Sequence, residues 1–202
     1  MSAYPSVSKT YGFQPIQRLD GLPYAGAIRQ IPIAAGYATA ILNGDTVVID
    51  TTGFLVAKTT TTSGDSVGVL VGCAYTNSSG QPVQGQYYPA ATSTSTNPAY
   101  AYVVDDPNAT FKVVATNGNT TTPSGYTRAL VGSNVAIVAQ VGSTATGDSY
   151  YGIDGASSTT AAFPIRVIDV VPGTSYISGG VTYYYEFIVK INLHQYNNTT
   201  GV

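Results

Sequence analysis

The chain is very poor in the residues that stabilise exposed helix surfaces. Its 202 residues include one glutamate, one methionine and four lysines, against 17 tyrosines and 22 glycines. Tyrosine, threonine and valine suit pleated strands and glycine suits tight turns, whereas exposed helix surfaces need charged and long-chain helix formers. The composition therefore predicts an all-β fold, with a β-barrel, β-tulip or β-sandwich body.

Residues 37–202 are predicted to form that body as a single domain, because β-rich runs alternate with polar turn segments throughout. Strands are expected over 37–42 and 46–50, joined as a hairpin by Asn43-Gly44, a favoured two-residue turn. The last strand, over 181–194, alternates apolar and polar residues for longer than most strands. It must therefore bend between two sheets or pair partly outside its own domain.

Residues 1–36 differ in composition from the rest. Pro5, Pro15, Pro23 and Pro32 recur with aromatic residues between them. Each proline favours extended geometry in the residue before it and removes an amide donor. We expect an extended N-terminal arm that reaches a neighbouring subunit, or alternatively a segment that lies over its own barrel.

Charge and length of apolar runs limit the possible partners. The net charge is −2 and only 9% of residues are charged, which is too few for the basic surface that phosphate backbones require. No apolar run approaches the roughly 18 residues of a membrane span. The single cysteine, Cys73, cannot form an internal disulfide. Neither nucleic acid nor a membrane is expected as a partner.

The acidic residues fall at turn positions. Asp45 and Asp50 follow and precede turns in the stretch ILNGDTVVID, and aspartate favours both places. Asp105 and Asp106 precede Pro107, which suits a turn and, as the alternative, a cation-binding loop. We expect turn roles for Asp45 and Asp50, and a turn that begins with Asp106 and has Pro107 second.

The remaining reactive residues do not form a recognisable catalytic set. His194 is the only histidine and is expected on the surface, while Cys73 is expected in the core and Glu186 on a regular strand. The stretch GSTATGDS has the frame of a phosphate loop, but Asp148 replaces the lysine and would repel phosphate. The chain is therefore predicted not to be an enzyme, with no catalytic residues, cofactor or metal.

Adjacent tyrosines occur at 87–88, 150–151 and 183–185. Neighbouring residues of a strand face opposite sides, so one of each pair should point outward. Outward tyrosines suit protein interfaces and also sugar stacking, and ordinary β propensity explains them equally.

The run YGFQPIQRLDGLPYAGAIRQIPIAAGYATAILNGDTVVID, with GVLVGCAYTN and YYPA after it, resembles the capsid cement or decoration proteins of tailed, podovirus-like phages. The resemblance covers roughly residues 11–115 and includes a Gly-Asp turn before a Val-rich strand. It implies a virion structural protein, made in the host cytoplasm, that binds the outer surface of the capsid and stabilises the shell. The implied partners are the major capsid protein and neighbouring copies of the chain itself in a homo-oligomer.

The arm would supply the capsid contacts in this interpretation. Phe13 and Tyr24 are the candidate apolar anchors, and Arg18 and Arg29 are the candidate partners for capsid carboxylates. The alternative function is a tail- or fibre-associated module that binds glycans through its tyrosines.

Overall fold

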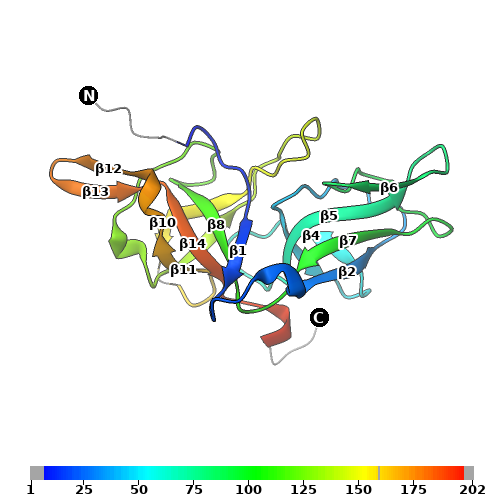
Figure 1. Ribbon diagram of the computed structural model, residues 1–202, viewed down its shortest axis with the longest axis horizontal. Helices are drawn as coiled ribbons and strands as arrows, with labels where there is room; N and C mark the ends of the chain where they lie inside the picture. The colour runs from blue at the N-terminus through cyan, green and yellow to red at the C-terminus, as the bar shows by residue number, and fades with distance from the viewer. Residues whose placement is uncertain (1–6, 159, 198–202) are drawn as a thin grey trace.

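The computed structural model describes residues 7–158 and 160–197 of the chain. The regular structure of these residues consists of β-strands and four short 3-10 helices. The strands form two six-stranded sheets and one two-stranded sheet. Figure 1 shows the two larger sheets as two bodies side by side, with the β12–β13 hairpin at the far end of one of them. The all-β prediction is confirmed.

The first body, here called barrel 1, is a sheet with the order β3-β4-β2-β7-β5-β6 in which β3 also pairs with β5. This extra pairing closes β2, β3, β4, β5 and β7 into a barrel and leaves β6 attached to β5. Its strands are β2 (Ile28–Ile33), β3 (Thr46–Ile49), β4 (Leu55–Ala57), β5 (Gly68–Thr76), β6 (Pro82–Gly85) and β7 (Ala99–Val104).

The second body, barrel 2, has the order β1-β8-β10-β9-β11-β14, and β8 also pairs with β14. Here β8, β9, β10, β11 and β14 close the barrel and β1 is attached to β8. Its strands are β1 (Gln14–Arg18), β8 (Ala109–Thr116), β9 (Asn134–Val138), β10 (Gly152–Ser158), β11 (Ile165–Val170) and β14 (Glu186–Ile191). The hairpin consists of β12 (Ser175–Ser178) and β13 (Val181–Tyr184), and the 3-10 helices are η1 (Tyr24–Ala27), η2 (Arg128–Leu130), η3 (Pro172–Thr174) and η4 (Gln195–Asn197).

The two barrels repeat one topology. The first and third strands of each closed ring are parallel, β2 with β4 and β8 with β10. All other pairings around the two rings are antiparallel and join corresponding strands. Barrel 1 therefore corresponds to barrel 2 when β2, β3, β4, β5 and β7 are matched with β8, β9, β10, β11 and β14.

The register of the strands is repeated as well. Ile33 lies opposite Leu55 in barrel 1, and Ala115 lies opposite Ile153 in barrel 2. Ile33 corresponds to Ala115 and Leu55 to Ile153, and the pairs beside them keep the same register. A β-bulge also interrupts the β5–β7 pairing and the β11–β14 pairing at the same point of the ring.

A glycine turn anchors each bulge. The amide of Gly44 donates to the carbonyl of Leu70 at 2.9 Å, and the amide of Gly132 donates to the carbonyl of Val167, also at 2.9 Å. Leu70 and Val167 are the last residues before the two bulges. The turn that precedes β3 is thus built in the same way as the turn that precedes β9.

The two turns share a sequence pattern, L-x-G-x-x-V-x-I, in ILNGDTVVID (41–50) and ALVGSNVAIV (129–138). Both glycines have a positive φ, 92° at Gly44 and 88° at Gly132, a conformation that favours glycine. The amide after each glycine donates to the leucine carbonyl, at 3.0 and 3.1 Å. The pattern is therefore the sequence trace of an internal repeat.

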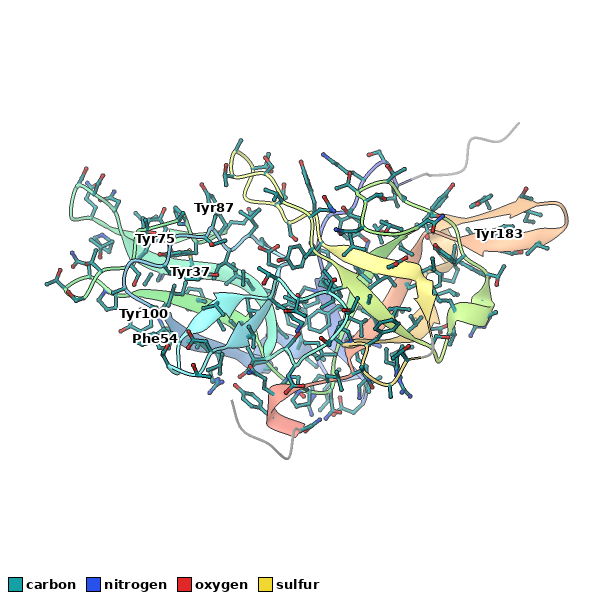
Figure 2. The ribbon with its side chains drawn as sticks, turned by 180° about the vertical axis from the view of Figure 1, so that it is seen from behind. Tyr37, Phe54, Tyr75, Tyr87, Tyr100 and Tyr183 are labelled. Atoms are coloured by element: carbon teal, nitrogen blue, oxygen red, sulfur yellow. The ribbon has the colours of Figure 1, made fainter. Side chains whose placement is uncertain are left out.

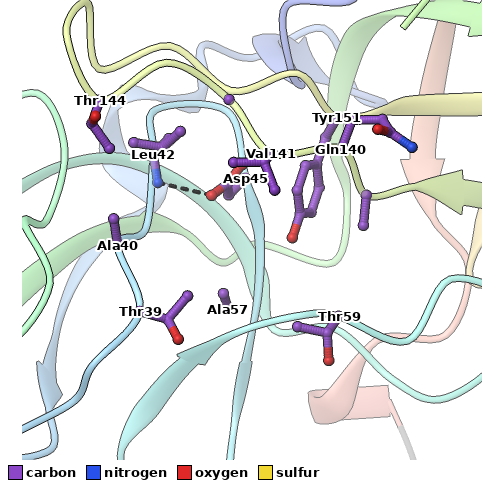
Figure 3. A pocket seen from close by; sticks show the side chains of 12 residues that line it. Thr39, Ala40, Leu42, Asp45, Ala57, Thr59, Gln140, Val141, Thr144 and Tyr151 are labelled. Atoms are coloured by element: carbon purple, nitrogen blue, oxygen red, sulfur yellow. Dashed lines mark hydrogen bonds between the residues drawn. The ribbon is translucent and has the colours of Figure 1, made fainter. Parts of the chain in front are cut away.

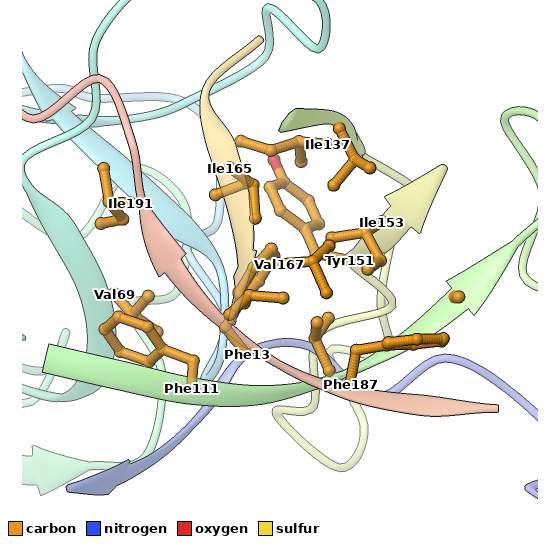
Figure 4. Packing of buried hydrophobic residues seen from close by; sticks show 14 of the residues in the cluster. Phe13, Val69, Phe111, Ile137, Tyr151, Ile153, Ile165, Val167, Phe187 and Ile191 are labelled. Carbon is orange, nitrogen blue, oxygen red and sulfur yellow. The ribbon is translucent and has the colours of Figure 1, made fainter. Parts of the chain in front are cut away.

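Each barrel has its own hydrophobic core, and one residue of the N-terminal segment enters the core of barrel 2. Phe13 is fully buried and meets the ring of Phe111 edge-on, with 6.3 Å between the ring centroids. Figure 4 shows Phe13 among side chains of barrel 2, with Val69 of barrel 1 beside Phe111. The core of barrel 2 is thus continuous with the junction between the barrels.

The prediction of a separate arm over 1–36 is corrected for the part that is described. Residues 14–18 form β1 on barrel 2, and residues 28–33 form β2 within the ring of barrel 1. The apolar alternation of Ile31 and Ile33 fits a strand with one buried face. Residues 1–6 lie outside the described residues. The boundary at residue 36 therefore does not separate an arm from a body.

Two strand predictions also change. The predicted hairpin of 37–42 with 46–50 is wrong, because β3 pairs with β4 on one edge and β5 on the other and a strand has only two edges. The long last strand does bend: it breaks at Tyr185 into β13, which pairs with β12, and β14, which belongs to barrel 2.

Candidate functional site

Phe13 was predicted to contact the capsid, but its side chain has no exposed surface. It is anchored by its own backbone, whose amide donates to the carbonyl of Gly44 at 2.9 Å. The apolar ring is therefore used inside the molecule, and the prediction of Phe13 as a contact residue is corrected.

Arg18 and Arg29 lie on either side of the turn that connects the barrels. Arg18 forms an ion pair with Asp106 at 3.0 Å, and Arg29 forms one with Asp105 at 2.6 Å. The hydroxyl of Tyr196 donates to the same Asp105 carboxylate at 2.9 Å. Burial raises the pKa of Asp105, and the adjacent Arg29 opposes that rise. These contacts fasten the N-terminal segment to the connecting turn, and partly exposed pairs of this kind contribute at most about 1 kcal/mol each.

The turn role predicted for Asp106 is confirmed, since its carboxylate accepts the amide of Asn108 at 2.7 Å. Asp50 likewise accepts the amides of Thr52 and Phe54, at 2.9 and 3.1 Å. The fourth predicted contact residue, Tyr24, is half-buried against the core of barrel 2.

Exposed apolar side chains gather on the same N-terminal segment. The exposed fractions are 39% for Ile16, 46% for Leu19, 54% for Leu22 and 42% for Ile28. We call these four residues the N-terminal patch. The amide of Leu19 donates to the carbonyl of Asn108 at 2.9 Å, so the patch borders the connecting turn. Apolar groups that are clustered and exposed in this way are typical of a contact surface.

A second exposed feature is the β12–β13 hairpin, which extends from barrel 2 (Figure 1). The ring of Tyr176 stacks between Tyr183 and Tyr185, with centroid distances of 5.3 and 5.0 Å. Ile177 and Val181 near the hairpin tip are exposed. Figure 2 shows Tyr183 on this hairpin, at the opposite end of the molecule from the labelled tyrosines of barrel 1. The three tyrosines stiffen the hairpin and cover part of each other's ring faces.

A cavity of about 260 Å³ lies between the barrels and is lined mainly by apolar groups. Figure 3 shows Asp45 and Tyr151 on its walls. The Tyr151 hydroxyl donates to the carbonyl of Lys58 at 2.8 Å, which fixes the ring in place. Burial raises the pKa of Tyr151, and the charge of Asp45 adds to the rise.

Asp45 holds the turn before β3, as predicted. Its carboxylate accepts the amide of Leu42 at 2.8 Å. Burial raises the pKa of Asp45 to about 6, although the hydroxyl of Ser149 and the amide of Leu42 act in the opposite direction. The turn roles predicted for Asp45 and Asp50 are therefore confirmed, because each carboxylate accepts backbone amides of a separate turn.

Glu186 is more buried than its sequence position indicates. Glu186 is 5% exposed and is covered by Tyr11, whose hydroxyl donates to it, while Lys112 lies 3.4 Å from the same carboxylate oxygen. Burial raises the pKa of Tyr11, and the hydrogen bond to Glu186 adds to it. Glu186, on the polar face of the last strand, is therefore covered by Tyr11 of the N-terminal segment, which no pattern within that strand reveals.

His194 was predicted on the surface and is in fact buried, so that prediction is wrong. Its Nδ1 accepts the amide of Tyr196 at 3.2 Å, and its neighbour Leu193 accepts the amide of Ser66 from the junction with barrel 1. Burial lowers the pKa of His194 to about 4. The histidine is neutral at pH 7 and belongs to the contact between the barrels.

Within residues 7–158 and 160–197, no three His, Cys, Asp or Glu side chains come together as a metal site. The same residues contain no helix long and apolar enough to cross a membrane. No protein-family model, curated protein or solved structure matches this chain.

The sequence analysis singled out Arg18 and Arg29 on the N-terminal segment and did not identify the exposed apolar residues beside them. The patch residues Ile16, Leu19, Leu22 and Ile28 lie between or beside the predicted arginines. The exposure of these residues could have been predicted from the sequence, because apolar residues next to Arg18 and Asp20 in a short turn have little room to be buried.

Proposed function

We propose that this chain is a virion structural protein, a capsid cement or decoration protein that binds the outer surface of major capsid subunits and stabilises the shell. The observation that carries the proposal is the N-terminal patch, where four large apolar side chains are exposed beside the junction of the two barrels. Proteins that act by contact need such a surface and need no reactive centre.

The expected energy of this contact follows from its area. Covering the exposed part of one leucine contributes about 1 kcal/mol. Four such residues give a modest affinity for one copy, and repetition around a closed shell, with neighbouring copies in contact, multiplies the effect. A protein that stabilises the shell through many weak contacts between capsid subunits is therefore favoured, and not one that binds tightly at a single site.

The test is uptake by phage shells that lack the protein. The wild-type chain is expected to bind saturably and to raise the temperature at which the shells rupture. The variant Leu19→Asp/Leu22→Asp is expected to bind at least about tenfold more weakly, because each carboxylate would be desolvated in the contact.

A matched control carries the same two charges elsewhere. Val141→Asp/Ile177→Asp alters two exposed apolar residues outside the patch and is expected to bind like wild type. Equal uptake of the patch variant and wild type would contradict the proposal. Deletion of residues 1–36 is not a useful substitute, since it removes β1 and β2 from the barrels.

The tyrosine hairpin supports a glycan-binding module as the second candidate. Tyr183 and Tyr185 each have one ring face against Tyr176, and their other faces could stack on sugars. Binding to a glycan array that is lost in Tyr183→Ala, together with no uptake by shells, would favour this alternative.

A further inference from the structure

The two barrels differ at one corresponding edge. In barrel 2, β1 lies antiparallel on the outer edge of β8, with Gln14 opposite Lys112 and Gln17 opposite Thr110. In barrel 1 the strand that corresponds to β8 is β2. Among the described residues, only Ile33 at the end of β2 has a partner on that edge.

The backbone of β2 directs hydrogen-bonding groups to this edge. Ala27 accepts a hydrogen bond from Asp105, and Ile28 to Ile33 pair antiparallel with β7. Residues of an antiparallel strand alternate between its two edges. Ile28 and Gln30 therefore present their amide and carbonyl groups to the outer edge, at the positions where Thr110 and Lys112 receive β1.

The side chains show the same contrast. On barrel 2, Thr110 and Glu186 are 2% and 5% exposed, because Gln17 accepts the hydroxyl of Thr110 and the hydroxyl of Tyr11 donates to Glu186. At the corresponding positions of barrel 1, Ile28 is 42% exposed and Tyr100 is 36% exposed. One face of the repeated barrel is thus covered by a strand, and its equivalent is open.

The side chains of the open face are uncharged. Ile28, Gln30, Pro32 and Tyr100 are uncharged, and the one cation beside them, Arg29, is paired with Asp105. A groove of about 410 Å³ lies farther along the sheet, beyond β7 from this edge, and is lined by residues of β5, β6 and β7, Tyr100 among them. A charged segment would lose hydration here without gaining an ion pair, so the complementary ligand is an uncharged extended chain.

We propose that the outer edge of β2 accepts an extended, uncharged strand of the major capsid protein, laid antiparallel to β2 as β1 lies on β8. The inference rests on the proposed function and names the part of the capsid that the chain binds. Main-chain hydrogen bonds from Ile28 and Gln30 give the contact its direction. Because the edge is short, the added strand must belong to a partner that the N-terminal patch also holds.

The experiment combines uptake by shells lacking the protein with hydrogen–deuterium exchange of the bound chain. The amides of Ile28 and Gln30 are expected to exchange at least about tenfold more slowly on shells than in the free protein. The amides of Arg29 and Ile31, which face β7, are expected to change little.

The variant Gln30→Lys places a charge on the open edge outside the N-terminal patch and is expected to weaken uptake about tenfold. Gln30 is exposed, so the thermal unfolding temperature should match wild type within a few degrees. The control Ile177→Lys adds the same charge at an exposed strand residue of the hairpin and is expected to bind like wild type.

The outcomes separate this inference from the proposed function. If wild type binds shells but the two amides stay unprotected and the edge variant binds equally, the strand-addition site is wrong and the cement function stands. If wild type does not bind shells, both fail. Protection of the same amides in a dimer of the free protein would show that a second copy fills the edge, and it would also overturn the inference.

Discussion

Barrel 1 and barrel 2 have the same strand order and the same register, yet they differ in what covers them. Barrel 2 carries β1 on its β8 edge and the tyrosine hairpin between β11 and β14. Among the described residues of barrel 1, the outer edge of β2 has a strand partner only at Ile33. The turn of barrel 1 that contains Gly44 is instead covered by barrel 2, because the amide of Asn43 donates to the carbonyl of Gly147. The two barrels therefore differ in the segments that cover them and not in their topology.

The largest expected effect comes from the two turn glycines. A Cβ on Gly44 would meet backbone atoms of Gly12 and Phe13 at 3.0 and 3.1 Å, whereas no described atom lies within 4 Å of a Cβ on Gly132. Both positions have positive φ. Gly132→Ala should cost about 1 kcal/mol from backbone strain alone, and Gly44→Ala about 3 kcal/mol, because the junction must also shift.

Denaturant unfolding of the two variants measures this difference. Equal losses would mean that the barrel 1 turn is not packed against the N-terminal segment, and the contrast between the covered and the open turn would fail.

The pH dependence of stability gives the second effect. The pKa of Asp45 is raised from its ordinary value of 3.8 to about 6, so its contribution to stability is full below pH 3.8 and is lost as the pH rises to about 6. The loss is at most about 3 kcal/mol. The pKa of His194 is lowered from 6.5 to about 4, so its contribution is full above pH 6.5 and is lost as the pH falls to about 4. The two dependences oppose each other in the wild type.

Single variants should separate the contributions of Asp45 and His194 when the free energy of unfolding is measured from pH 3.5 to 7.5. With Asp45→Asn the free energy of unfolding should rise with pH over this range, and with His194→Gln it should fall. Ser133→Asp places a carboxylate at the corresponding turn of barrel 2, which is half-exposed, and should leave the profile unchanged. Identical slopes in Asp45→Asn and His194→Gln would contradict the assignment.

The smallest effect compares the covered and the open face. Tyr11→Phe removes the hydroxyl that donates to buried Glu186 and should cost about 1 to 2 kcal/mol. Tyr100→Phe, at the position of barrel 1 that corresponds to Glu186, should change stability by less than about 0.5 kcal/mol. A similar loss in both variants would show that the open face of barrel 1 is covered.

The composition was sufficient to predict the fold class, because a chain with one glutamate and 17 tyrosines has few alternatives to strands. Strand pairing was not accessible in the same way. The Asn43-Gly44 turn was found correctly, but the strand after it pairs with β4 and β5. Local turn chemistry fixes the bend and does not fix the partner, which depends on edges formed far away in the sequence.

The internal repeat could have been detected from the sequence, since L-x-G-x-x-V-x-I occurs at 41–50 and 129–138. The burial of Phe13, Glu186 and His194 could not, because each is covered by a segment distant in the chain. Their local patterns reveal which side of a strand they occupy and nothing about what lies over that side.

The central claim, that the chain acts by fitting its N-terminal patch and β2 edge to the capsid, is tested most directly by an electron-microscopy map of the intact virion. The map is expected to show two adjoining barrels on the outer surface of the shell, with Leu19, Leu22 and β2 facing the major capsid protein and a capsid strand beside β2. Density for the barrels in the tail or fibres, or on the capsid with the patch and β2 turned to solvent, would contradict it.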